Sequence, residues 1–124
     1  MRKLTLALTL AFLACSAGPT FPQTPVPFEP LEIYDQWWLE VQRCSGRIGR
    51  AAVIDWYLVP NGPWTDPTFP GLILYGLTNG RQVYIAGGQQ NQAWIVKHEM
   101  LHVLGFHHDD AYPPYPWPFE GCTD

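Results

Sequence analysis

Residues 96–110, VKHEMLHVLGFHHDD, decide the fold that we expect, because they contain all four histidines of the 124-residue chain. His98 and His102 are four positions apart, so on a helix their imidazoles lie on one face, one turn apart, where one metal ion can bridge them. The remaining residues of this helix are apolar on nearly all sides, which indicates a buried position. We therefore predict a central helix that is capped by Asn91 and runs through Leu104.

The same stretch contains the other groups that a hydrolytic zinc site needs. Glu99 lies about 100° around the helix axis from His98, beside a bound metal rather than among its ligands, where a carboxylate can take a proton from water. A third ligand is required, and Gly105 lets the chain leave the helix in a left-handed conformation. Either His107 or His108 can then return to the metal. The spacing favours His108, and three imidazoles favour Zn²⁺ over magnesium or calcium.

Written as His98-Glu99-x-x-His102-x-x-Gly105-x-x-His108, this segment resembles the zinc signature of the metzincin metallopeptidases. The resemblance implies that the three histidines are zinc ligands, that Glu99 is the general base of peptide-bond hydrolysis, and that the fold is zincin-like. Metzincins also place a methionine turn below the metal. Met1 and Met100 are the only methionines of this sequence, so we expect an atypically small member without that turn.

One helix and three strands are predicted on the amino-terminal side of the motif. Apolar residues recur at three- and four-residue steps over residues 31–43, after Pro30 and before Gly46, which predicts an amphipathic helix. Asn79-Gly80 is typical of a tight hairpin turn. The predicted strands are rich in β-branched and aromatic residues and cover residues 51–59, 72–77 and 81–86. The expected fold class is therefore α+β, with antiparallel or mixed strands packed against the motif helix.

The first residues are typical of an export signal. Arg2 and Lys3 precede an apolar run over residues 4–14 that is too short to span a membrane. Two cleavage sites fit the sequence that follows. A lipobox-like cut would make Cys15 the lipidated first residue and anchor the protein to a membrane, whereas a cut after Ala17 would release it. We expect a bacterial protein that is secreted, periplasmic or lipid-anchored.

The chain divides into a signal peptide, a proline-rich linker and a single domain, over residues 1–17, 18–30 and 31–124. A chain of this length can bury one modest core. After export, Cys44 and Cys122 are the two cysteines left to pair in an oxidising compartment, and we predict a disulfide between them. Two separate buried thiols are the alternative.

Charge argues against a nucleic-acid partner. Loss of Arg2 and Lys3 changes the formal net charge from −4 to −6, and no lysine or arginine cluster remains. We expect a peptide or protein substrate, held by backbone hydrogen bonds at the exposed edge of one of the two hairpin strands. Whether an unknown partner completes the substrate cleft stays open.

The tail after Asp110 is rich in proline and aromatic residues, so we expect it to be irregular and fastened by the disulfide. The phenols of Tyr112 and Tyr115 are close enough in sequence to hydrogen-bond to the oxyanion of a tetrahedral intermediate, although simple packing is the alternative. Asp109 or Asp110 can fix the tautomer of a ligand histidine, and solvated loop acids are the alternative. Residues 115–119 are expected to form an apolar floor in place of the methionine turn.

Two other functions are compatible with the motif. One is a non-catalytic zinc-bound domain whose coordination sphere is closed and inert. Glu99 argues against it, because a structural site gains nothing from a carboxylate beside the metal. The other is suggested by residues 101–108, which also resemble the metal site of bacterial rRNA-processing endoribonucleases. Those sites have a small residue in place of Glu99, and the acidic charge disfavours RNA.

Overall fold

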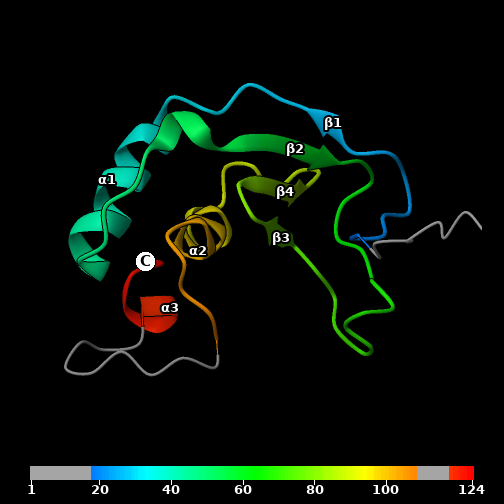
Figure 1. Cartoon of the computed structure of the whole chain (residues 1–124). Helices are drawn as coiled ribbons and strands as arrows, with labels where there is room; N and C mark the ends of the chain where they lie inside the picture. Colours follow the sequence, from blue (N-terminus) through cyan, green and yellow to red (C-terminus); the bar gives the residue numbers. More distant parts are fainter. Residues whose placement is uncertain (1–17, 109–117) are drawn as a thin grey trace, which may run out of the picture.

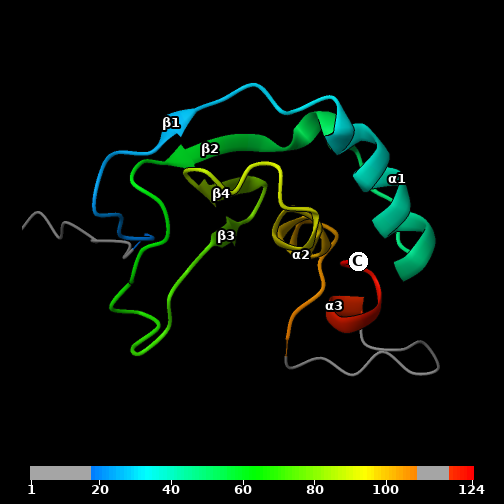
Figure 2. The ribbon, with the colours of Figure 1, turned by 180° about the vertical axis from the view of Figure 1, so that it is seen from behind.

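The structure, a computed structural model, describes residues 18–108 and 118–124 as an α+β domain. In chain order its elements are β1 (Val26–Pro27), α1 (Ile33–Ser45), a 3₁₀ helix (Ala51–Val53), β2 (Asp55–Val59), β3 (Gly76–Asn79), β4 (Gln82–Ala86), α2 (Ala93–Val103) and α3 (Pro118–Gly121). Figures 1 and 2 show the three helices together at one end and the long β2–β3 connection at the other. No helix within the described ranges is long and apolar enough to cross a bilayer. The predicted signal peptide and Cys15 lie outside these ranges.

The strands form one mixed sheet in the order β1-β2-β4-β3. The outer pairs β1–β2 and β3–β4 are antiparallel, and the central pair β2–β4 is parallel. Strand β4 therefore has a neighbour on each side, whereas β3 is an edge strand. Of the two hairpin strands expected to offer an edge to a substrate, only β3 has one in the described sheet.

The segment predicted as a proline-rich linker packs against this sheet. Val26 pairs with Leu58 of β2, and the backbone N–H of Thr20 donates to the Asp66 carboxylate at 3.1 Å. The ring of Phe21 lies 4.5 Å from that of Tyr84. Proline is excluded from central strands because it lacks an N–H, but an edge strand tolerates it. The segment is extended, as its composition indicates, and it supplies the fourth strand that the sequence did not predict.

Two of the predicted strands begin several residues too early. Ala51–Val53 forms a 3₁₀ helix closed by the hydrogen bond from Ile54 N–H to the Ala51 carbonyl, so β2 begins only at Asp55. The run predicted over residues 72–77 joins the sheet only from Gly76. Its first half instead pairs through Leu74 with Trp64 in an isolated bridge. In the first segment, a hydrogen bond within the 3₁₀ helix uses a backbone group that could otherwise pair with a neighbouring strand. In the second, the bridge between Leu74 and Trp64 does the same.

The hairpin turn and the start of α2 are each shifted by one residue from the prediction. Asn79 pairs with Gln82 as the last residue of β3, so Gly80 and not Asn79 takes the positive φ (+64°). This is the position that glycine occupies in a type II′ turn. The N-cap of α2 is Gln92, because the bond from Gln92 N–H to the Gln89 carbonyl places Asn91 inside the preceding turn.

The sheet is covered on both faces, as the alternation along β4 shows. Val83 and Ile85 face α1 and α2 in the larger cluster, whereas Tyr84 and Ala86 face the opposite cluster with Trp64. Helix α2 lies between α1 and the sheet. Its Val96, Met100 and Leu101 have no exposed surface, which confirms the central helix that the sequence predicts.

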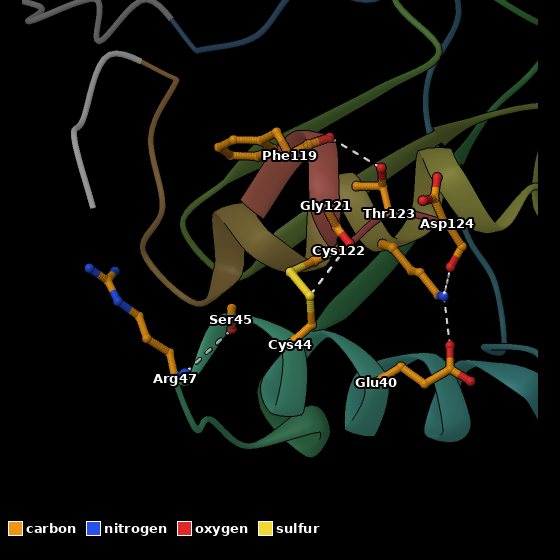
Figure 3. Close-up of a disulfide and its surroundings, with 10 residues drawn as sticks. Glu40, Cys44, Ser45, Arg47, Phe119, Gly121, Cys122, Thr123 and Asp124 are labelled. Atoms are coloured by element: carbon orange, nitrogen blue, oxygen red, sulfur yellow. Dashed lines mark hydrogen bonds and ion pairs between the residues drawn. A yellow bond between two sulfur atoms is a disulfide. The ribbon is translucent and has the colours of Figure 1, made fainter. Parts of the chain in front are cut away.

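The predicted disulfide between Cys44 and Cys122 is present, with an S–S distance of 2.01 Å. It joins the carboxyl end of α1 to the residue after α3 (Figure 3). Buried Lys97 of α2 makes a second link, because its ammonium lies 2.6 Å from Glu40 of α1 and also donates to the Asp124 carbonyl. The carboxyl-terminal residues are thus held against α1 and α2. Such a disulfide is typical of proteins from an oxidising, extracytoplasmic compartment.

Candidate metal centre

Helix α2 ends at the turn that the sequence predicts. Gly105 has φ +92°, and its N–H donates to the His102 carbonyl at 2.9 Å. The next N–H, that of Phe106, donates to the Leu101 carbonyl at 3.1 Å. These two bonds form a Schellman motif, which requires a left-handed residue at the position of Gly105. The chain then reverses and brings His108 back beside the helix.

His98, His102 and His108 form one group whose potential ligand atoms all lie within 4.8 Å of one another. The Nε2 atoms of His102 and His108 are 3.1 Å apart. Two ligands of one tetrahedral zinc are separated by roughly 3.3 Å, given Zn–N bonds of about 2.0–2.1 Å. The three side chains are therefore able to hold a metal ion. His107, the alternative third ligand, is not part of the group.

A backbone carbonyl fixes the orientation of the His102 ring. Nδ1 of His102 lies 2.9 Å from the Phe106 carbonyl oxygen. Because a carbonyl only accepts hydrogen bonds, Nδ1 of the neutral ring carries the proton and Nε2 presents its lone pair. A hydrogen bond on the distal nitrogen is the usual support of a metal-bound histidine. The Schellman turn thus places both the third histidine and the carbonyl that orients the second.

Burial keeps the imidazoles in the form that binds metals. Desolvation, followed by the charges of His102 and His108, lowers the pKa of His98 to about 4. Desolvation also lowers the pKa of His102, although its bond to the Phe106 carbonyl opposes this shift. Both rings are therefore neutral at pH 7, which leaves a lone pair for a metal ion.

Glu99 is buried between α2 and β3, with 5% of its surface exposed. The hydroxyl of Thr78 donates to Oε2 of Glu99 at 2.6 Å and also lies 3.2 Å from the Glu99 carbonyl oxygen. Burial raises the pKa of the Glu99 carboxyl to about 7, whereas the bond from Thr78 lowers it. Glu99 is not in the metal-binding group, as its position beside His98 predicts.

Gly76 leaves the space that the Glu99 carboxyl occupies. A Cβ at residue 76 would lie 2.9 Å from both Cγ and Oε1 of Glu99. A glycine within a strand often marks this kind of close approach. Gly76 and Thr78 therefore hold the carboxylate from the same strand, one by leaving room and the other by a hydrogen bond.

The substitution Gly76→Ala is expected to destabilise the metal-free protein by about 1–3 kcal/mol, the usual effect of overpacking a buried site. The new methyl group would displace Glu99 from Thr78. Urea denaturation measures the change in the free energy of unfolding. Gly18→Ala is the matched control, because no atom lies within 4 Å of a Cβ at that position. An equal effect of the two substitutions would contradict the packing that we describe.

A phenylalanine ring lies against all three imidazoles. The centroid of Phe119 in α3 is 4.7 Å from the centroids of His98 and His102 and 4.4 Å from that of His108, with which it is stacked. Phe119 belongs to the segment 115–119 that was expected to form an apolar floor below the metal. The rest of that segment, including Trp117, lies outside the described residues.

Several predicted site residues also lie outside the described ranges: Asp109, Asp110, Tyr112 and Tyr115. Three groups that contact the site were not predicted, namely the Phe106 carbonyl, Thr78 and Gly76. Of these, Gly76 alone carried a signal in the sequence, as a glycine inside an apolar strand run.

Comparison with protein-family models, with curated proteins and with solved structures found no match for this chain.

Proposed function

We propose that this protein is an exported zinc-dependent peptidase with Glu99 as its general base. The observation that carries the proposal is the position of this carboxylate. It is buried, it follows a histidine of the metal-binding group directly in sequence, and it is not itself one of the grouped ligands. A carboxylate in this position costs folding free energy, so a purely structural metal site has no use for it. The metzincin-like motif agrees with the same function.

His98, His102 and His108 would hold the zinc ion. When bound, zinc supplies Lewis-acid polarisation of the peptide carbonyl and lowers the pKa of water. Among the described residues, Thr78 is the only hydrogen-bond partner of the Glu99 carboxylate, and it occupies Oε2. With zinc bound, the Glu99 carboxylate would accept the proton of the attacking water and return it to the nitrogen of the leaving amine.

The edge strand β3 is suited to bind the peptide. The bond from Ala86 N–H to the Tyr75 carbonyl shows that residue 75 faces β4, and alternation makes Leu77 and Asn79 do the same. The backbone groups of Gly76 and Thr78 then point to the open edge, where a peptide can pair as an added strand. These are the two residues that contact Glu99, so a peptide bound there would lie close to the base.

A cavity of about 230 Å³ adjoins the same edge. Its lining includes Phe69 and residues 77–79 of β3, with Asp66 and Thr68 beside them. A peptide paired with β3 could insert one side chain into it. The mixed lining of apolar and polar groups agrees with a peptide substrate, and the net charge of −4 for the whole chain disfavours nucleic acid.

Removal of the metal tests this function directly. The oxidised protein is expected to cleave members of a mixed peptide library when loaded with zinc. Treatment with a chelator should abolish cleavage, and added Zn²⁺ should restore it, because the proposed nucleophile is a water molecule that the metal activates. Mass spectrometry of the peptides measures the result. Cleavage that persists in protein shown to be metal-free would contradict the proposal.

A non-catalytic zinc-binding domain is the second candidate, and the low exposure of Glu99 favours it. With 5% of its surface exposed, the side chain has little contact with solvent in the absence of a substrate. This function predicts stoichiometric zinc binding through the three histidines and no cleavage of any peptide in the library. The same experiment therefore separates the two candidates.

A further inference from the structure

Phe119 is the one described side chain whose ring meets all three imidazoles of the metal-binding group. We propose that Phe119 is a positioning residue of the metal centre, and that its ring is a rigid floor that fixes the imidazoles in the arrangement that binds the ion. This inference rests on the proposed metal centre. It adds a residue from α3, outside the histidine motif.

The three histidines need different amounts of support. His98 and His102 are fixed by helix α2, where backbone hydrogen bonds determine their spacing. His108 follows the helix and is exposed. The ring of Phe119 is stacked on His108 with an interplanar angle of 29°, and it touches the two helical histidines at larger angles. It therefore fixes the third ligand relative to the first two.

Helix α3 is itself held firmly, although it has only four residues. The Cys122 N–H donates to the Pro118 carbonyl at 2.8 Å, and the Thr123 hydroxyl donates to the Phe119 carbonyl at 3.1 Å. The disulfide then fastens Cys122 to Cys44 of α1 (Figure 3). A side chain on so short a helix would not be a reliable support by itself, but the disulfide fastens α3 to α1 and so limits the movement of Phe119.

A ring that only filled the core would affect stability alone. A ring that positions ligands also changes metal affinity in protein that remains folded, because disordered imidazoles must be ordered when the ion binds. The dissociation constant for Zn²⁺ is therefore the readout that separates the two roles. It does not depend on peptide cleavage.

The experiment compares Zn²⁺ affinity, by competition with a chromophoric chelator, in the oxidised wild type and in Phe119→Ala, Phe119→Leu and Phe21→Ala. Phe21→Ala is the matched control, since it removes the same ring from the opposite face of the sheet. Circular dichroism verifies that each variant is folded. We expect Phe119→Ala to raise the dissociation constant by about tenfold or more, the usual effect of removing a group that supports metal ligands. Phe119→Leu should fall between the wild type and Phe119→Ala.

Each outcome bears on the proposal. Unchanged affinity in folded Phe119→Ala overturns it, as does an equal loss in Phe21→Ala. If Phe119→Ala does not fold, Phe119→Leu is the deciding variant, because leucine keeps an apolar side chain but lacks a flat face. Unchanged Zn²⁺ affinity in Phe119→Leu then overturns the proposal. If the wild type binds no metal, the proposed function fails as well. Metal binding by the wild type with unaltered affinity in both Phe119 variants removes the positioning role alone.

Discussion

Glu99→Gln is expected to lower the kcat/KM of peptide cleavage by about 10²- to 10⁴-fold, the range of general acid–base contributions, while bound zinc stays at the wild-type level. Glutamine has nearly the same shape as glutamate, and its carbonyl oxygen can still accept the hydrogen bond from Thr78. Its amide cannot take a proton from water at neutral pH. The substitution therefore removes the base and preserves the packing around it.

Three measurements make this result interpretable. Cleavage rates are compared at equal zinc content, which elemental analysis determines, and urea denaturation verifies that the free energy of unfolding is maintained. Glu29→Gln is the control, because it makes the same chemical change at an exposed residue of the amino-terminal segment. Cleavage by zinc-loaded Glu99→Gln at the wild-type rate would show that another group is the base. Loss of zinc together with cleavage would mean that Glu99 supports the metal centre instead.

The local parts of the site could be predicted from the sequence. The spacing of His98 and His102 fixes their relation as soon as a helix is recognised, and Gly105 marks where that helix must end. Both expectations depend on backbone geometry within one or two turns, and both are confirmed. The pairing of Cys44 with Cys122 was also predictable, because few other pairings were available.

The parts of the site that depend on tertiary contacts could not be predicted. Gly76 and Thr78 contact Glu99 because β3 packs against α2. That packing follows from the strand order β1-β2-β4-β3, which no single segment of the sequence determines. Phe119 meets the histidines because a disulfide fixes α3. The apolar character of residues 115–119 indicated a floor below the metal but not which ring would form it.

The amino-terminal proline-rich segment shows how composition can mislead. Five prolines between residues 18 and 30 exclude a helix and favour an extended chain, and such a composition predicts a linker. An extended chain is also what an edge strand requires, and Val26 pairs with β2 for that reason. The composition of the segment therefore predicted its extended conformation correctly. Its place in the fold depends on tertiary contacts, such as that of Phe21 with Tyr84.

The double substitution Cys44→Ser/Cys122→Ser is expected to lower the free energy of unfolding of the metal-free protein by about 2–5 kcal/mol, the usual cost of losing a native disulfide in a small domain. The bond joins residues 78 positions apart, so its loss releases a long loop in the unfolded chain. Urea denaturation measures the change, and reduced wild-type protein is the control for the serines themselves. A loss below about 1 kcal/mol would show that Lys97, through Glu40 and Asp124, suffices to hold the tail. Since α3 carries Phe119, we also expect the folded disulfide-free protein to bind Zn²⁺ more weakly.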